Sequence, residues 1–414
     1  MTELFEATFA FTLDAEADAR AIVRRFAVGQ TTGTWVEVPG LTDELRAAHE
    51  GRVLSLYQVP AADTTTSMTP GRVGYLVTIG IPSANVGDSL PQLLNTVIGN
   101  DASTSMEAKL VGLRFPDAML DGFGGPGHGI EGLRRLTGVA DRPLLLNMLK
   151  PCVGLSPSAA AEIFEATARG GIDLIKDDEL MGNTGYSTVL ARVEAFRAAA
   201  DRAEAETGRH TVYLPNVTDR PDRMLKTAKA AVDAGAEALM VAYTTVGYGG
   251  VQMLRDEVGV PVLGHFAGAA PFFEGAGSGM ASELACGLLP RLAGADLALV
   301  NTPFGGYPIT KHAYLQTAAR LVEPLGSSGA GTIKAAMPII GGGVHPGTVA
   351  RYVGDLGNDI VLGAGGAIQG HPMGAAAGVR AMLQAIEAVR EGVPLDQAEG
   401  RELQAAVARW GVLD

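Results

Sequence analysis

The sequence predicts an α/β protein with a C-terminal TIM (β/α)8 barrel and a smaller N-terminal α+β domain. From residue 143 onward, short apolar, β-branched runs alternate with Ala-rich stretches of helical period. Most of the 55 glycines follow the apolar runs, where a strand would lead into a loop. The first 120 residues differ, because they contain several strand-like runs and only two helical stretches.

The barrel prediction rests on eight apolar runs, which with their helices cover about 260 residues, a usual length for a TIM barrel. We expect strands at 143–151, 172–177, 210–218, 238–246, 261–268, 297–303, 335–342 and 359–366. Helices are expected between them, for example at 156–170, 186–208 and 374–392. In such a barrel the reactive residues stand on loops at the carboxyl ends of the strands. A doubly wound sheet is the structural alternative.

The N-terminal domain is expected to span residues 1–124 and the barrel residues 125–414. Its strands are predicted at 5–13, 33–41, 52–60, 71–82 and 108–116, and its helices within 14–28 and 89–99. The Gly- and Pro-rich segment 121–129 is the expected junction. It contains a formal GxGxxG, but Pro126 interrupts it and no strand leads into it, so a dinucleotide-binding loop is not predicted.

Composition excludes several classes of partner. The net charge is −13 and no cluster of Lys and Arg occurs, so no nucleic-acid partner is expected. No apolar run is long enough to span a membrane and the first ten residues are acidic, so we expect a cytoplasmic protein without a membrane partner. The two cysteines, Cys152 and Cys286, are too few for a disulfide framework or a thiolate zinc site.

The densest chemistry lies in GGIDLIKDDEL, residues 170–180, where four ionisable groups end an apolar strand. Because side chains alternate along a strand, Lys176 and Asp178 point the same way, and the turn that follows can bring Glu179 beside them. Two carboxylates beside an amine suit Mg²⁺, which prefers hard oxygen ligands. A solvated charge run after a strand is the alternative.

This segment closely resembles the activation motif of ribulose bisphosphate carboxylase (RuBisCO) and the RuBisCO-like proteins. Further similar motifs follow in collinear order over nearly the whole chain: TTGTW (31–35), TVIGN (96–100), GPGHGI (125–130), LKPCVGLS (149–156), GHFAGA (264–269), GGGVHPG (341–347) and GAGGAIQGHPMGA (363–375). The resemblance implies a ferredoxin-like N-terminal domain followed by a barrel.

The resemblance also implies roles for individual residues. Lys176 would be carbamylated by CO₂ and would bind Mg²⁺ together with Asp178 and Glu179. Lys150 and His265 would be catalytic groups beside the reacting carbons. Asn100 would reach the site of a second subunit, which implies a homodimer or a multiple of dimers.

One substrate phosphate is expected at two glycine turns. Gly342, Gly343, Gly365 and Gly366 follow strands seven and eight, where TIM barrels commonly bind phosphate through backbone N–H groups. Simple turn formation is the alternative for these glycines. By resemblance, Thr34 and Trp35 of the partner subunit would close over the same phosphate.

Departures from the carboxylase pattern argue against CO₂ fixation. Gly306 stands at about the position of the carboxylase's loop lysine, and Phe266 and Leu299 replace groups that hold a second phosphate. Other replacements fall at Gly29, Cys152 and Gly341. The chain therefore looks like a non-carboxylating RuBisCO-like protein that enolises a substrate with one phosphate.

Several substrates fit the resemblance. The expected one is a monophosphorylated keto sugar or oxo sugar acid, with decarboxylation or C–C cleavage of 3-oxo-isoapionate 4-phosphate as a candidate reaction. The alternatives are a methionine-salvage 2,3-diketo-5-methylthiopentyl-1-phosphate enolase and a methylthioribulose-phosphate isomerase. The salvage enolase carries a lysine at the position of Asn100, which disfavours it here. A non-catalytic sugar-phosphate binding or regulatory protein is the alternative from another class, although four converging charged groups argue against it.

Overall fold

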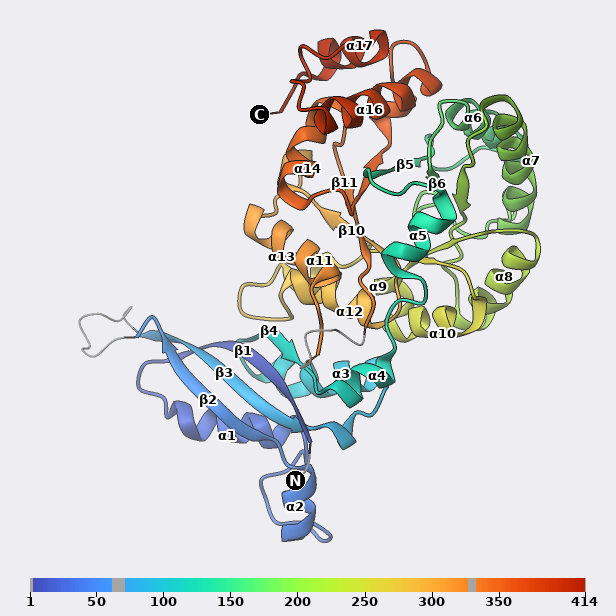
Figure 1. The fold of residues 1–414 in the computed structure, drawn as a ribbon. Coiled ribbons are helices and arrows are strands. Elements are labelled where there is room, and N and C mark those ends of the chain that lie inside the picture. The colour runs from blue at the N-terminus through green and yellow to red at the C-terminus, as the bar shows by residue number, and fades with distance from the viewer. Residues whose placement is uncertain (1–2, 62–70, 327–332, 414) are drawn as a thin grey trace. The chain divides into compact units, whose positions relative to one another are not determined.

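An antiparallel sheet and a closed parallel sheet, in separate units of the chain, organise the fold (Figure 1). The computed structural model describes residues 3–61, 71–326 and 333–413. One unit comprises Met1–Gly124, Gly268–Ala285 and Pro324–Ile333, and the other comprises Gly125–Ala267, Cys286–Glu323 and Lys334–Asp414. The domain boundary expected from the sequence at residue 124 stays a prediction.

The first unit contains a four-stranded antiparallel sheet in the order β2-β3-β1-β4. Helices alternate with the strands in the β-α-β-β-α-β order of ferredoxin-like folds, with a short additional helix, α2. The elements are β1 (Leu4–Asp14), α1 (Ala19–Gly29), α2 (Asp43–His49), β2 (Arg52–Val59), β3 (Arg72–Pro82), α3 (Leu90–Val97), β4 (Ala108–Arg114), α4 (Asp117–Phe123) and α11 (Ala270–Phe273).

Strict alternation along β1 explains how α1 packs on this sheet. Every second side chain of the strand is buried, as expected for a strand with one face toward a core. Phe9 and Phe11 point to that face, and each ring centroid lies 5.0 Å from that of Phe26 of α1 in an edge-to-face arrangement. The aromatic cluster therefore fixes the helix against the strand.

The strand predicted at 33–41 is wrong. This segment is irregular, and Val36 and Val38 are exposed. Gly33 and Gly40 have φ angles of +74° and +92°, which an extended strand does not adopt, and Pro39 has no N–H to pair. Apolar residues do alternate in this segment of the sequence. The backbone turns at both ends of the segment, however, and it pairs with no strand within the described chain.

The second unit contains the predicted eight-stranded parallel sheet, with the order β7-β6-β5-β12-β11-β10-β9-β8. Its strands are β5 (Leu144–Met148), β6 (Leu174–Lys176), β7 (Val212–Leu214), β8 (Leu239–Ala242), β9 (Val262–His265), β10 (Leu297–Asn301), β11 (Met337–Gly341) and β12 (Val361–Ala364). All eight predicted strands are thereby confirmed, although each is shorter than predicted. The run at 238–246 is partly wrong, because Tyr243–Val246 forms helix α9.

The sheet closes into a barrel between its two end strands. A parallel bridge joins Asn216, just beyond β7, to Met240 of β8, and the Val217 N–H donates to the Met240 carbonyl at 2.9 Å. Inward-facing side chains from all eight strands form one buried cluster that includes Leu144, Leu174 and Leu297. The interior is therefore a packed core, and reactive groups are expected only at its ends.

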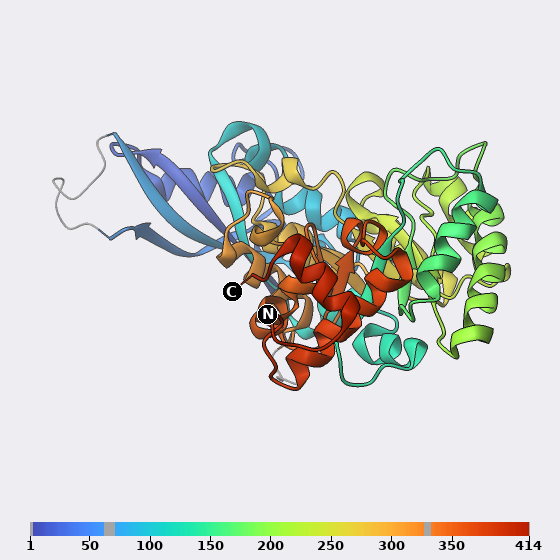
Figure 2. The same cartoon turned by 90° about the horizontal axis from the view of Figure 1, so that it is seen from above.

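Helices surround these strands (Figure 1), and the C-terminal helices α16 and α17, red in the turned view of Figure 2, pack against each other. No helix in the described part of the chain is long and apolar enough to cross a membrane. The helices of this unit are α5 (Gly129–Thr137), α6 (Pro157–Ala168), α7 (Val189–Thr207), α8 (Pro221–Asp233), α9, α10 (Tyr248–Val258), α12 (Leu289–Leu292), α13 (Lys311–Val322), α14 (Val349–Leu356), α15 (Gly366–Gln369), α16 (Ala375–Arg390) and α17 (Arg401–Trp410).

Candidate active site

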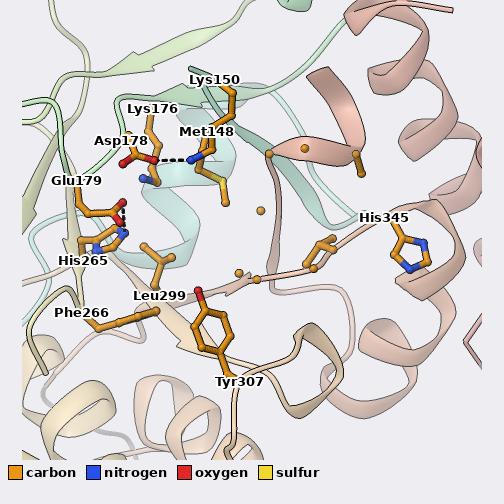
Figure 3. A pocket seen from close by; sticks show the side chains of 18 of the residues that line it. Met148, Lys150, Lys176, Asp178, Glu179, His265, Phe266, Leu299, Tyr307 and His345 are labelled. Atoms are coloured by element: carbon orange, nitrogen blue, oxygen red, sulfur yellow. Dashed lines mark hydrogen bonds and ion pairs between the residues drawn. The ribbon is translucent and has the colours of Figure 1, made fainter. Parts of the chain in front are cut away.

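The charged run after β6 divides between the two sides of the chain. Lys176 ends β6, and Lys176, Asp178 and Glu179 line a cavity at the carboxyl ends of the strands (Figure 3). Asp177 does not line it. The side chains of Lys176, Asp177 and Asp178 are at most 5% exposed, so the interpretation as a solvated charge run does not describe these residues.

Asp177 is held on the other side by a buried ion pair. Arg192 donates from Nε and Nη2 to Asp177 Oδ2 at 3.1 and 2.9 Å, and Tyr213 Oη donates to Oδ1 at 2.8 Å. The Asn216 N–H also donates to Oδ2, at 2.9 Å. Burial raises the pKa of Asp177, and Arg192 only partly opposes this effect. The residue therefore fixes the turn that presents its neighbours to the cavity.

Lys176 is a buried amine without a carboxylate bonded to it in the described chain. Its Nζ donates to the Asp177 carbonyl at 2.9 Å. Burial lowers the pKa of Lys176 to about 8, although Asp178 and Glu179 act in the opposite direction. A substantial fraction of neutral amine is therefore present near pH 8, and the neutral amine is the form that can react with CO₂.

Lys150, which follows β5, lies against Asp178. Its Nζ donates to Asp178 Oδ2 at 2.7 Å and to Cys152 Sγ at 2.8 Å. Burial lowers the pKa of Lys150, but its hydrogen bonds to Asp178 and Cys152 outweigh this, so the pKa is raised overall. For Asp178, burial raises the pKa, but the hydrogen bonds with Lys150, Cys152 and the Leu180 N–H together outweigh this, so the pKa is lowered overall. Lys150 is consequently a protonated donor at the cavity.

His265, the last residue of β9, faces Glu179. Its Nδ1 accepts from the Ala267 N–H at 3.1 Å, and its Nε2 lies 3.4 Å from Glu179 Oε2. Burial, followed by the charge of Lys176, lowers the pKa of His265 to about 3. The imidazole is therefore neutral at physiological pH, and because Nδ1 accepts a hydrogen bond, its proton lies on Nε2. In this arrangement His265 presents an N–H, not a free lone pair, to the cavity.

The cavity between these groups has a volume of about 500 Å³. Lys150, Lys176, Asp178, Glu179 and His265 converge on one part of it, as Figure 3 shows. Apolar side chains and a row of glycines line the rest: Met148, Phe266, Leu299, Tyr307, Val344, Ala367, Trp410, Gly341, Gly342, Gly343, Gly363, Gly365 and Gly366, together with His345. A pocket with a few convergent polar groups among apolar walls is typical of a small-molecule site.

The four predicted phosphate-binding glycines all line this cavity, but for two different physical reasons. Gly342 and Gly343 have φ angles of +90° and +77°, and a Cβ atom on either would collide with the neighbouring loop. Turn formation alone accounts for them. A Cβ atom on Gly366, the first residue of α15, would meet nothing within 4 Å. The open backbone at this turn leaves room for a ligand to approach its N–H groups.

Thr34, Trp35 and Asn100 belong to the other unit, whereas every residue that lines the cavity belongs to the barrel unit. Thr34 is half-buried and Asn100 is exposed. Trp35 is 52% exposed, with the Arg25 guanidinium 4.5 Å above its ring. Their predicted role at the active site of a partner subunit stays a prediction.

Sequence reasoning missed two aromatic residues of the cavity, Tyr307 and Trp410. Tyr307 follows Gly306 in the loop after β10, so its place beside the departure at Gly306 was a usable signal. Trp410 ends α17, far along the chain from every strand, and no motif marks it. Only the packing of α17 brings this ring to the barrel mouth.

The residues present fit a hard divalent cation if Lys176 is modified. Within the described ranges, no three side chains of the His, Cys, Asp and Glu types are arranged to hold a metal ion. Asp178 and Glu179 offer two carboxylates on the cavity side, and carbamylation of the buried amine between them would add oxygen ligands. Such a donor set matches Mg²⁺, which takes a few carboxylates and fills its other positions with water and substrate.

The family follows from comparison of the sequence with known families. Residues 129–410 match the model described as ribulose bisphosphate carboxylase large chain, catalytic domain. The chain belongs to the RuBisCO large-chain family. The match covers nearly all of the barrel, including every side chain that lines the cavity.

Individual members of the family resemble the whole chain. A ribulose bisphosphate carboxylase-like protein of Archaeoglobus fulgidus is 39% identical, over 90% of this chain and 84% of its own length. A 2,3-diketo-5-methylthiopentyl-1-phosphate enolase of Geobacillus kaustophilus is 34% identical over 98% of each chain. The crystal structure of a rubisco-like protein (MtnW) from Alicyclobacillus acidocaldarius superposes with a TM-score of 0.90 at 34% identity, covering 99% of this chain and 100% of that one. The family prediction and the fold class are thus confirmed.

Proposed function

We propose that the chain is an Mg²⁺-dependent enzyme that enolises a monophosphorylated keto sugar or oxo sugar acid and does not fix CO₂. The observation that carries this proposal is the convergence of Lys150, Lys176, Asp178, Glu179 and His265 on one cavity. Maintenance of the fold does not require such a cluster, because it leaves a buried amine without a bonded carboxylate. A non-catalytic sugar-phosphate binder is correspondingly disfavoured.

Asp178, Glu179 and carbamylated Lys176 would hold the cation. Bound there, Mg²⁺ would stabilise the negative charge that develops on a substrate ketone oxygen as an adjacent bond to carbon breaks. The neutral Lys176 amine favoured by burial is the chemical requirement for carbamylation. This supports the carbamate as part of the proposal.

The protonation states divide the proton-handling roles. Lys150 Nζ is a protonated donor held beside Asp178, so it can give a proton to a substrate oxygen. His265 offers its Nε2 proton while Nδ1 is occupied by the Ala267 N–H. Neither presents a free lone pair, and Asp178 and Glu179 would hold the cation, so we assign proton acceptance to an oxygen of the Lys176 carbamate.

The absence of CO₂ fixation is proposed from the far wall of the cavity. Phe266 and Leu299, where the family's carboxylases hold a second phosphate, offer only carbon atoms. Gly306, at about the place of the loop lysine, carries no side chain. Each lost charge-assisted phosphate contact is worth roughly 1.5–3 kcal/mol, so two of them correspond to about 10²- to 10⁴-fold in affinity for a bisphosphate.

A second candidate is enolisation of 2,3-diketo-5-methylthiopentyl 1-phosphate. The name of the Geobacillus relative favours it, and the apolar wall would suit a methylthio group. Asn100 disfavours it, because the salvage enolases carry a lysine base at that position. Both candidates share the enolisation step and the single phosphate.

Exchange of a substrate α-proton for deuterium tests the proposed reaction. We would incubate the protein with CO₂ and Mg²⁺ in D₂O and offer 3-oxo-isoapionate 4-phosphate, ribulose 5-phosphate and the methylthiopentyl diketone phosphate in turn, since the first can also report decarboxylation or cleavage. Exchange that requires Mg²⁺ and disappears in Lys176→Ala, but persists in the exposed-lysine control Lys226→Ala, is expected. Incorporation of labelled CO₂ into ribulose bisphosphate above the Lys176→Ala background would overturn the proposed lack of carboxylation.

The active unit is proposed to be a homodimer in which Thr34, Trp35 and Asn100 complete the partner's site. All residues that line the cavity of one chain belong to the barrel unit. This leaves room for residues of a partner's N-terminal domain to complete the site and supports the proposal. Mixing Asn100→Ala with Lys176→Ala protein should regenerate some intact sites. Heterodimers that form but show no regained exchange would contradict shared sites.

A further inference from the structure

The loop after β10, in which Gly306 stands at about the place of the carboxylase lysine, brings an aromatic hydroxyl into the cavity. Thr302 Oγ1 caps the short turn Pro303–Gly305, Gly306 follows with a φ of +85°, and Tyr307 comes next. The Tyr307 ring packs against Gly342, so closely that a Cβ atom there would collide with it. The ring is thus fixed between two loops of the barrel mouth.

The Tyr307 hydroxyl is free to bind a ligand. The residue lines the cavity and is 46% exposed, and within the described part of the chain its hydroxyl makes no hydrogen bond. Figure 3 shows this oxygen pointing into the cavity, on the side of Leu299 and Phe266, while Lys150 enters from the opposite side. A rigid aromatic ring with an unused donor is a strong means of fixing a ligand's orientation.

The surroundings of the hydroxyl are apolar. Leu299 is 4% exposed, and a Cβ atom on Gly341, next to Gly342, would lie 3.0 Å from its Cδ2. Phe266 packs on the same buried cluster as Leu299. A ligand that fills this part of the cavity would expel the water that otherwise bonds to Tyr307, so it must supply an oxygen of its own or leave the hydroxyl unpaired.

We propose that Tyr307 is a specificity-determining residue, whose hydroxyl binds an oxygen atom at the substrate end far from a phosphate held at the Gly365–Gly366 turn. The substrate class is then a ketone monophosphate with a hydroxyl or carboxylate at that end, and substrates ending in a thioether are disfavoured. This inference rests on the proposed function and sharpens it. A site built to hydrogen-bond a substrate oxygen rejects analogues that lack it more strongly than an apolar wall rejects an added oxygen.

A matched pair of probes tests the inference: 2,3-diketo-5-methylthiopentyl 1-phosphate and its counterpart with a hydroxyl in place of the methylthio group. Deuterium exchange is measured with CO₂ and Mg²⁺ for the unaltered protein, for Tyr307→Phe and for the control Tyr57→Phe, which removes an exposed hydroxyl elsewhere. Tyr307→Phe keeps the ring against Gly342, so the fold is retained. We expect the KM of the hydroxyl probe to rise about 3- to 10-fold with kcat within about twofold, and no change for the thioether probe.

The outcomes separate the two proposals. Equal kinetics of Tyr307→Phe and the unaltered protein on both probes, or equal losses on both, would overturn the role of Tyr307 and leave enolisation standing. A complete absence of Mg²⁺-dependent exchange by the unaltered protein on either probe would overturn the proposed enolisation of such monophosphates, and the role of Tyr307 with it. A loss confined to the hydroxyl probe supports both.

Discussion

The two ends of the barrel use the same side chain, a histidine, in opposite electrostatic states. At the carboxyl ends of the strands, burial lowers the pKa of His265 to about 3 and the ring is neutral. At the amino ends, His210 lies before β7 with Glu204 and Glu237 each 2.9 Å from a ring nitrogen. The hydrogen bond to Glu237 is the largest effect and raises the pKa of His210. Burial opposes it, but the hydrogen bond to Glu204 adds to it, and the pKa is about 9.

The comparison separates charged groups that stabilise the barrel from charged groups that are available for catalysis. At the amino ends several charges meet a counter-charge, as where Arg142 donates from two nitrogens to both oxygens of Asp173 at 2.7 Å. Buried Asp296, just before β10, instead accepts backbone N–H groups of His128, Gly129 and Val262. At the carboxyl ends the Lys176 amine donates to a carbonyl instead. Buried groups with shifted pKa values and incomplete pairing are characteristic of functional sites.

The largest expected effect is loss of activity in Lys176→Met, which keeps an unbranched apolar chain but removes the amine. We expect exchange to fall by about 10³-fold while the urea midpoint stays the same or rises, because burial of an unpaired charge is costly. Deuterium exchange and urea denaturation of the same preparation measure both. A large loss of stability would show that Lys176 supports the fold as the amino-end charges do.

Arg192→Met should have the largest effect on stability. It leaves Asp177 buried without its counter-charge, and breaking a buried pair of this kind costs about 3–5 kcal/mol. Chemical denaturation checks the value. Arg202→Met is the control, because Arg202 is 56% exposed in its pair with Glu165, and such surface pairs contribute at most about 1 kcal/mol. Similar losses in the two variants would contradict the distinction between them.

Activation by CO₂ should depend on pH through Lys176. Carbamate forms on the neutral amine, so with a pKa of about 8 the reactive fraction rises roughly tenfold between pH 7 and pH 9. The initial rate of activation, started by adding CO₂ and Mg²⁺ and corrected for the CO₂ concentration at each pH, is the measurement. If the activation rate had its midpoint near pH 10.5, the lowering of the Lys176 pKa by burial would be contradicted. His265, with its pKa of about 3, should add no step near pH 6–7.

The smallest expected effect is on the stability of His210→Gln. The folded pKa of His210 is raised, so its contribution is fully present below the unfolded value of about 6.5 and is lost as pH rises through about 9. Because the side chain is 36% exposed, the contribution should stay below about 1 kcal/mol. The urea midpoints of both proteins are compared at pH 6 and pH 10. A difference that persists at pH 10 would have another origin.

Much of the barrel could be predicted from the sequence, because parallel strands buried on both faces give short, uniformly apolar runs. Local alternation also placed Lys176 and Asp178 on one side of the chain. The segment 33–41 shows the limit of such reasoning. Its pattern fits a strand, but strand formation needs a partner, and sequence pattern does not report partners.

The aromatic part of the site was only partly predictable from the sequence, for a related reason. The glycine turns and the charged run can be recognised as sequence motifs. Tyr307 and Trp410, in contrast, reach the cavity through packing between segments distant in the chain. The Lys150 hydrogen bond to Asp178 likewise depends on the register of β5 beside β6. Residue types were predictable there, but their pairings were not.

Gly306 bears on which side chains its loop can accept. A Cβ atom at this position would meet nothing within 4 Å, yet the φ angle of +85° is one that other residues rarely adopt. A lysine placed there would therefore find room and would lose only about 1–2 kcal/mol to backbone strain. A charged side chain could thus be introduced into this loop by a single substitution that the fold survives. The structure around Gly306 is therefore not by itself what keeps a lysine out of this loop.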